Sequence, residues 1–307
     1  MLKVQSPSRT SLNRCLCLSM MTAFSIVVMT HALAQTPKLS GSALPTSVWA
    51  VTTTNELIQV NAAAPGKVLQ RKPIKGLMHG ENLVGIDYRV SRGTLFGLTQ
   101  IGRLYTINTV TGDLSPVGAS VAIPGLQAQT IGFDFNPAAD RIRVVSSGGM
   151  NLRFHPETGA QVDFDPKMDG VQADPSLTFA AGDTSFGKKP NVVAAAYTYN
   201  KKNEKLTTNY AIDGSLGALL MQGSEENAQP VVSPNLGRLT TIGSLGLGKL
   251  QDVSFDISDL ANTPLAAVRT AKSKQTRLVQ IDLKSGHATS LGILGNGEAV
   301  TGLAIEP

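Results

Sequence analysis

Short apolar runs recur along this chain, and each is interrupted by one small residue. They read LVGIDY at 83–88, TIGFDF at 130–135, DVSFDI at 252–257 and VTGLAI at 300–305, with the small residues at 85, 132, 254 and 302. A further copy, LTFAAGD at 177–183 with its small position near Ala180, divides the longest interval. Short runs rich in β-branched and aromatic residues predict strands.

Hairpin patterns lie between these runs. Each is a short strand followed by a turn rich in Asn, Asp, Pro and Gly, and they occupy 57–66, 104–112, 152–159, 210–214 and 278–286. These turn residues tolerate positive φ or preset φ, as tight turns require. Further strands are expected at 94–98, 141–145, 192–197 and 265–269. A repeat of roughly 48 residues with four short strands is typical of a propeller blade.

The pattern therefore predicts an all-β, single-domain β-propeller of about five four-stranded blades. The fourth unit is longer than the others, and we assign its excess to the polar loops 199–208 and 223–237. The recurring small residue has a physical cause in this fold, because innermost strands converge at the axis and leave little room for side chains.

The two ends of the chain are expected to complete one blade. Residues 298–305 copy the first strand of a unit, whereas VWAV at 48–51 reads as a second strand. Pairing these ends would close the ring and remove a free sheet edge. Two alternatives remain open. One is a two-sheet β-sandwich, which does not explain the divided repeat, and the other is a six-bladed ring with a degenerate blade inside 198–245.

The beginning of the chain is typical of a secretory signal peptide. Three bases and no acid precede an apolar run at 16–30, which is followed by Ala32-Leu33-Ala34. The run is shorter than the roughly 20 residues that a membrane-spanning helix needs. We expect a signal peptide at 1–34 cleaved after Ala34, a flexible lead-in at 35–46 and the propeller at 47–307. The mature protein would be secreted or periplasmic, without a membrane span.

Composition narrows the function classes. The formal net charge of +5 includes the three bases of the signal, so the mature chain carries 24 bases and 22 acids and lacks the basic surface that nucleic-acid binding requires. Both cysteines, Cys15 and Cys17, lie in the signal, which excludes disulfides, thiol catalysis and Cys-ligated zinc in the mature chain. We expect a monomer.

No complete catalytic motif is present. A G-x-S-x-G elbow, a Walker loop and a dinucleotide fingerprint are all missing. The mature histidines, His79, His155 and His287, do not have the i, i+4 spacing of a helical zinc site. These absences favour a binding module over an enzyme.

One candidate ligand site lies just before the recurring strands. Its members are polar residues three or four positions before a small residue: Glu81, Asn82, Gln129, Gln251 and Glu298. In a closed ring they would stand at similar heights near one mouth of the channel. Amides and carboxylates gathered there would bind a small polar ligand or a hard cation, which prefers oxygen donors. The alternative is that they bind loop backbone or face water.

Acids and arginines elsewhere have structural interpretations. Asp87, Asp134 and Asp256 end the recurring strands just before tight turns, where short acids commonly accept backbone N–H bonds. The alternative is a ring of carboxylates that holds a metal. Arg143 and Arg153, close together in one unit, would either form ion pairs or hold an anion.

Three stretches carry a family resemblance. The runs GENLVGIDYRVSRGTLFGL, IGFDFNPAADRIRVVSSGGMNLRFHPETG and NVVAAAYTYN resemble a bacterial domain-of-unknown-function family of the β-propeller group. The similarity covers roughly residues 47–306, and the second run is its specific part. The resemblance implies the fold and export, and it brings no reaction or catalytic residues.

These observations leave three functions open. The first is an exported, non-enzymatic binding module for an unknown protein, polysaccharide or small polar ligand. The second is a metal-dependent hydrolase of the sugar-lactonase type, with a cation at the channel mouth held by Glu81 and Glu298. The third is an envelope scaffold. No cofactor is expected, with a divalent cation such as calcium as the alternative.

Overall fold

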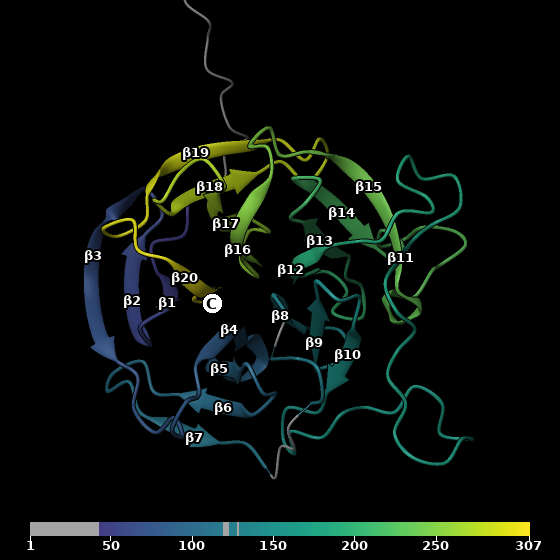
Figure 1. The fold of residues 1–307 in the computed structure, drawn as a ribbon, viewed down its shortest axis with the longest axis horizontal. Helices are drawn as coiled ribbons and strands as arrows, with labels where there is room; N and C mark the ends of the chain where they lie inside the picture. Colours follow the sequence, from purple (N-terminus) through teal and green to yellow (C-terminus); the bar gives the residue numbers. More distant parts are fainter. Residues whose placement is uncertain (1–42, 119–122, 128) are drawn as a thin grey trace, which may run out of the picture. The chain divides into compact units, whose positions relative to one another are not determined.

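Five β-sheets surround a common axis in the computed structural model, which describes residues 43–118, 123–127 and 129–307 (Figure 1). The described chain is all-β apart from two short 3-10 turns, at Val90–Arg92 and Pro234–Leu236. The predicted signal peptide (1–34) and the lead-in up to residue 42 lie outside the described residues. Among the described residues, no helix has the length and apolar character needed to span a membrane.

Three sheets have the predicted four strands. One contains β4 (Leu83–Arg89), β5 (Thr94–Thr99), β6 (Leu104–Ile107) and β7 (Leu114–Pro116). Another contains β16 (Leu250–Ile257), β17 (Pro264–Thr270), β18 (Arg277–Ile281) and β19 (Ala288–Ile293). A third joins the two ends of the propeller: β20 (Val300–Ile305), β1 (Val48–Thr52), β2 (Glu56–Asn61) and β3 (Ala64–Pro73).

The other two sheets differ in strand number. One has three strands: β8 (Ile131–Asn136), β9 (Arg141–Ser146) and β10 (Asn151–Phe154). The other has five: β12 (Val192–Tyr197), β13 (Asn209–Asp213), β14 (Ala218–Gln222), β15 (Arg238–Ser244) and β11 (Thr178–Phe179). The five-bladed propeller is therefore confirmed, and the sandwich and six-bladed alternatives are wrong.

The ring closes through the two ends of the propeller. β1 pairs antiparallel with β20, with Val48 opposite Ile305 and Ala50 opposite Leu303. β20 is the innermost strand of this blade and β3 is its outer edge (Figure 1). The pairing predicted from the divided repeat is confirmed, and it leaves β1 with a partner on both sides.

Small residues allow the five innermost strands to approach one another. A Cβ placed on Gly85 of β4 would lie 2.5 Å from Cβ of Phe133, and one on Gly132 would lie 2.7 Å from the Ala194 carbonyl carbon. Both distances are too short for real atoms, which confirms the predicted reason for the small residues. The hollow left between the strands at this level is only about 10 Å³, roughly the space of one water molecule.

The third innermost strand lies elsewhere than the sequence predicted. The segment 177–183, which was interpreted as a copy of the innermost-strand motif, contributes only β11. This strand pairs in parallel with β15 at the outer edge of its sheet. The innermost strand is β12, where Ala194 takes the small position and Ala196 replaces the acid. The motif was not recognisable because both of its marker residues are alanine.

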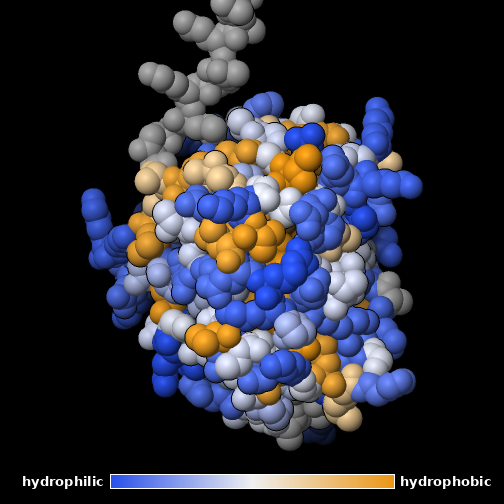
Figure 2. All heavy atoms as spheres, turned by 90° about the vertical axis from the view of Figure 1, so that its left-hand side faces the viewer, coloured by the Kyte–Doolittle hydropathy of each residue, from blue (hydrophilic) through white to orange (hydrophobic). Residues whose placement is uncertain are grey.

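The hydrophobic core lies between neighbouring blades. Between the sheets of β4 and β8, aromatic side chains meet edge to face, with Phe96 and Phe135 at 5.1 Å between ring centroids. On the outside, β3 exposes polar side chains such as Lys67, Gln70 and Arg71. Figure 2 shows this side of the disk, where hydrophilic residues are interleaved with smaller hydrophobic patches. Charged residues on an edge strand oppose pairing with another chain.

Gly85→Ala is expected to destabilise the protein by about 1–3 kcal/mol, because the added Cβ overpacks the axis. The matched control is Gly66→Ala in β3, where the nearest atom would be a carbonyl oxygen at an ordinary 3.6 Å. Denaturant unfolding of both variants measures the difference. Equal stabilities would contradict the packing explanation.

Deleting residues 298–307 is expected to prevent folding, because the edge of β1 next to the axis would lose its partner. Deleting only Glu306 and Pro307, which lie beyond β20, should leave a folded chain. Circular dichroism and size-exclusion chromatography distinguish the two truncations. A folded monomer without residues 298–307 would be inconsistent with this closure.

Candidate functional site

Three aspartates meet where innermost strands end. Asp87 on β4, Asp134 on β8 and Asp256 on β16 each stand two residues after the small residue of their strand. The equivalent positions on β12 and β20 are Ala196 and Ala304. One carboxylate oxygen from each aspartate lies within 4.8 Å of the others, and all three residues are buried. We call these three residues the axial aspartates.

Each axial aspartate bonds to the next blade. Oδ2 of Asp87 accepts the N–H of Phe135 at 2.7 Å, and Oδ2 of Asp134 accepts the N–H of Tyr197 at 2.8 Å. Asp256 accepts the N–H of Ile305 in the same way, at 2.5 Å. The expected donors were in the turn that follows each acid. The convergence of the strands instead brings the neighbouring innermost strand within reach.

Burial makes the charges of the axial aspartates costly. Loss of solvent, together with repulsion from neighbouring carboxylates, holds the pKa of Asp87 and of Asp134 well above the usual range. Loss of solvent also raises the pKa of Asp256 to about 7. Among the described residues that line their hollow there is no lysine or arginine, and Asp259 adds a fourth carboxylate. Neutrality therefore requires either shared protons or a cation.

The axial aspartates form part of a larger surface. Their hollow, of about 20 Å³, adjoins a second of about 170 Å³ through Tyr199. It adjoins a third, of about 240 Å³, through Tyr197, and Asn136 lines both the second and the third. We call the side of the disk that carries these three hollows the aspartate face.

Charges in the second hollow are largely paired with one another. Nε of Arg89 donates to Oδ1 of Asp140 at 2.8 Å, and its Nη1 donates to Oε1 of Glu157 at 2.7 Å. The bonds to Arg89 hold the pKa of Asp140 below its ordinary value. These ion pairs connect β4 to the turn between β8 and β9 and to the loop after β10, and so stabilise the contact between two blades.

The site predicted at the opposite mouth is not assembled as expected. A hollow of about 190 Å³ lies there, and of the five predicted residues only Gln129 lines it. Its other polar lining residues are Thr130, Asp252 and Thr301. Oε1 of Gln129 accepts a bond from Ser147 at 3.1 Å, and Gln251 is exposed.

Both predicted carboxylates at that mouth are engaged within the protein. Oε2 of Glu81 accepts bonds from the Tyr105 hydroxyl at 3.1 Å and from the Met78 N–H at 3.2 Å. Glu298 forms an ion pair with Arg71 and accepts the N–H of Asn296 at 2.7 Å.

The last predicted member of that set, Asn82, is tied to its surroundings as well. Its Oδ1 accepts a bond from Nδ2 of Asn55 at 2.9 Å. The two acids and Asn82 therefore hold loops in place rather than converging on the axis.

The sequence contained partial signals for the aspartate face. The axial aspartates were singled out by their repeat positions, and the carboxylate ring was weighed as an alternative to turn binding. No sequence signal pointed to Tyr197, Tyr199 or Asp259 as neighbours of these acids. They come from a later blade and from loops that are adjacent only after the ring closes.

The fold and this face define a five-bladed β-propeller with an acidic hollow on its axis. The chain belongs to the family described as "Domain of unknown function (DUF4394)", whose model matches residues 56–304. A comparison with curated protein sequences finds no match.

Several solved structures are similar to this chain. One is a structural genomics protein of unknown function from Bacteroides thetaiotaomicron, at 12% identity and a TM-score of 0.43, covering 81% of this chain and 58% of that one. TolB from Acinetobacter baumannii has 9% identity and a TM-score of 0.44, with 82% and 54% covered. Kuenenia stuttgartiensis hydrazine synthase has 13% identity and a TM-score of 0.36, with 72% and 53% covered. The chain thus spans a little more than half the length of these proteins.

In protein stripped of metal, the free energy of unfolding is expected to fall as the pH rises from about 4 to about 7. The pKa of Asp256 is about 7 in the folded state, whereas the ordinary pKa of an aspartate is 3.8. Between these values the folded chain binds more protons than the unfolded chain, so a rise in pH favours unfolding. The full rise in the pKa of Asp256 corresponds to a loss of on the order of 4 kcal/mol in the free energy of unfolding.

The comparison that isolates this group is wild type against Asp256→Asn, followed by denaturant unfolding across the window. The variant should lose part of the pH dependence, whereas Asp169→Asn, at an exposed loop position, should keep it. An unchanged slope in Asp256→Asn would show that this carboxyl does not hold its proton in the folded state.

Proposed function

We propose that this chain is an exported, non-enzymatic binding module with a divalent cation at its axial aspartates. Its ligand, a small polar molecule, would seat on the aspartate face. Export is supported by the predicted signal peptide at 1–34. The observation that carries the proposal is the meeting of three buried carboxylates in a hollow whose described lining residues include no base.

The cation follows from the cost of burying like charges. Three ionised carboxylates within 4.8 Å of one another need a countercharge, and protons supply it only at low or neutral pH. Hard cations such as calcium take oxygen ligands, and each axial aspartate has a second oxygen besides the one bonded to the next blade. The hollow of about 20 Å³ suits a single ion or water.

The surroundings of the axial hollow favour a polar ligand. Tyr88, Tyr197 and Tyr199 line it, and such rings offer apolar contact together with a hydroxyl. The adjoining hollows, of about 170 and 240 Å³, provide room for groups that extend away from the axis. Concave sites with a few converging polar groups are the usual form of small-molecule sites.

The other two candidate functions have weaker support. A hydrolase of the sugar-lactonase type was expected to use Glu81 and Glu298 as cation ligands, but neither lines the hollow at that mouth and each has partners elsewhere. An envelope scaffold would need no ion. Binding of a stoichiometric ion therefore separates a scaffold from the proposed module, and hydrolysis of a lactone would separate the module from an enzyme.

The test is titration of metal-stripped residues 35–307 with calcium and magnesium at about pH 8, where the carboxyls are most strongly driven to ionise. Native mass spectrometry and calorimetry should show one bound ion, and the ion should raise the unfolding temperature. Asp134→Asn should weaken the affinity at least about tenfold.

The variant keeps an oxygen that can accept the Tyr197 N–H, so its fold should survive. Without metal it should be no less stable than wild type, because one repelling charge is gone. Asp169→Asn, at an exposed loop position, serves as the matched control and should bind as wild type does. Absence of a stoichiometric ion, or equal affinity in Asp134→Asn, would refute the axial cation.

A further inference from the structure

Three arginines from two adjacent strands line the third hollow of the aspartate face. Arg141 and Arg143 lie on β9, and Arg153 lies opposite Arg143 on β10. The hollow has a volume of about 240 Å³, and its other polar lining residues are Asn136, Tyr197, Ser233 and Asn235. We call it the arginine hollow.

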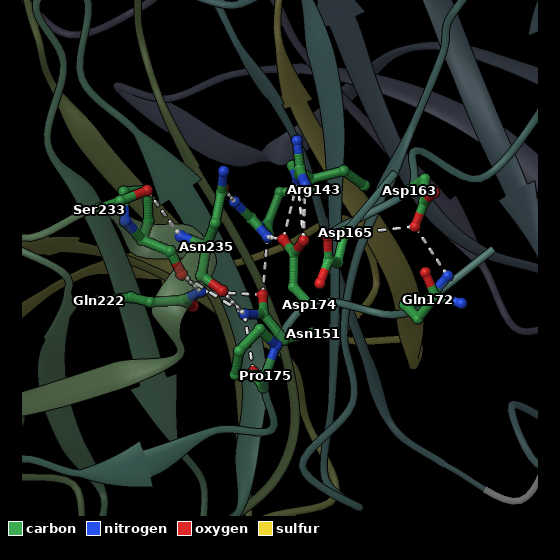
Figure 3. A network of polar contacts seen from close by, with 12 residues as sticks. Arg143, Asn151, Asp163, Asp165, Gln172, Asp174, Pro175, Gln222, Ser233 and Asn235 are labelled. Atoms are coloured by element: carbon green, nitrogen blue, oxygen red, sulfur yellow. Dashed lines mark hydrogen bonds and ion pairs between the residues drawn. The ribbon is translucent and has the colours of Figure 1, made fainter. Parts of the chain in front are cut away.

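Arg143 forms the fixed floor of this hollow. Its side chain is 1% exposed, and its guanidinium donates to Oη of Tyr197 at 3.1 Å, to Oδ1 of Asn151 at 2.7 Å and to Asn235. A fourth bond reaches Oδ2 of Asp174 at 2.6 Å. Figure 3 shows the side chains of Arg143, Asn151, Asp174 and Asn235 in this network. The network holds a positive charge in place without solvent.

The positive charges of the hollow exceed the negative ones. Asp174 forms ion pairs with both Arg143 and Arg153, the latter through Nη2 at 2.7 Å. Arg141 instead donates from Nη1 to the backbone carbonyl of Asp140 at 2.8 Å, while the Asp140 carboxylate pairs with Arg89. Two of the three guanidinium groups therefore share the Asp174 carboxylate, and the third lies near Asp140, whose carboxylate is paired with Arg89.

Donors remain available to a ligand. The bonds of Arg153 use only its Nε and Nη2, and those of Arg141 use only Nη1, so each guanidinium has N–H groups beyond the bonds described. Arg153 is 18% exposed, which leaves it reachable from the hollow. The Ser233 hydroxyl accepts the Asn235 N–H and keeps its own proton to donate.

We propose that the arginine hollow binds a doubly charged oxyanion, inorganic phosphate or the terminal phosphate of a phosphate ester. The positive charge of the three arginines, which Asp174 and Asp140 offset only in part, suits the double negative charge of such a group near neutral pH. Guanidinium groups form paired, directional hydrogen bonds with phosphate oxygens, and burial strengthens them. The site does not depend on a cation at the axial aspartates, since its charges come from different residues.

The experiment is calorimetric titration of metal-stripped protein with inorganic phosphate, and separately with glycerol phosphate, at low ionic strength. Binding of both should be seen, and chloride at the same concentration should not compete. Arg141→Gln should weaken phosphate binding at least about tenfold, because it removes one of the three positive charges that line the hollow. The matched control, Arg277→Gln at an exposed position of β18 in another blade, should leave binding unchanged.

Arg153→Gln is the second variant, and it too should weaken phosphate binding while Asp174 keeps Arg143 as its partner.

If glycerol phosphate binds more tightly than inorganic phosphate, the natural ligand is a phosphate ester. If inorganic phosphate binds more tightly, the natural ligand is the free ion. No binding at about 10 mM of either probe would overturn the proposal. Binding that Arg141→Gln and Arg153→Gln both leave intact would overturn it as well, because the anion would then sit elsewhere. Either failure leaves the axial cation untouched.

Discussion

The convergence of five innermost strands at one axis is the constraint on which the rest of this structure depends. Backbones that approach this closely exclude ordinary side chains, so the strands carry glycine, alanine or serine at the narrowest level. The same convergence brings each strand's polar backbone groups within reach of the next strand. An aspartate two residues further along can therefore bond to a neighbouring blade rather than to its own turn.

The axial aspartates have opposing effects because of this geometry. Each stabilises a contact between blades through an N–H bond, yet the three carboxylates repel one another in a place that water barely reaches. Two positions of the ring carry alanine instead, at Ala196 and Ala304. A purely structural ring of bridges would gain from an acid in all five places. Only three of the five positions carry an acid, and these three meet at the axis although an alanine strand stands on each side of Asp256.

How much could be predicted from the sequence depended on whether a feature is local or long-range. The blade number and the pairing of the two ends were predictable, because the spacing of the motif and its division between the ends are linear properties of the chain. The third innermost strand was not, since alanines replace both of its marker residues. The prediction of a site at the channel mouth used only the positions of Glu81 and Glu298 along the axis, which follow from their distance in sequence to the small residue of the strand. Their partners, Tyr105 on β6 and Arg71 on β3, become neighbours only through tertiary packing.

The position of β20 has a consequence for how the chain acquires its structure. An innermost strand, and with it one wall of the axial hollow, is supplied by residues 300–305, which come last in the order of strands. Until they emerge from the ribosome, β1 has an unpaired edge and the contacts of sequence-distant blades cannot all form. A nascent chain that lacks these residues therefore has an incomplete blade at β1 and an axial hollow without one of its walls. Topology alone thus delays closure of the ring until β20 has been synthesised.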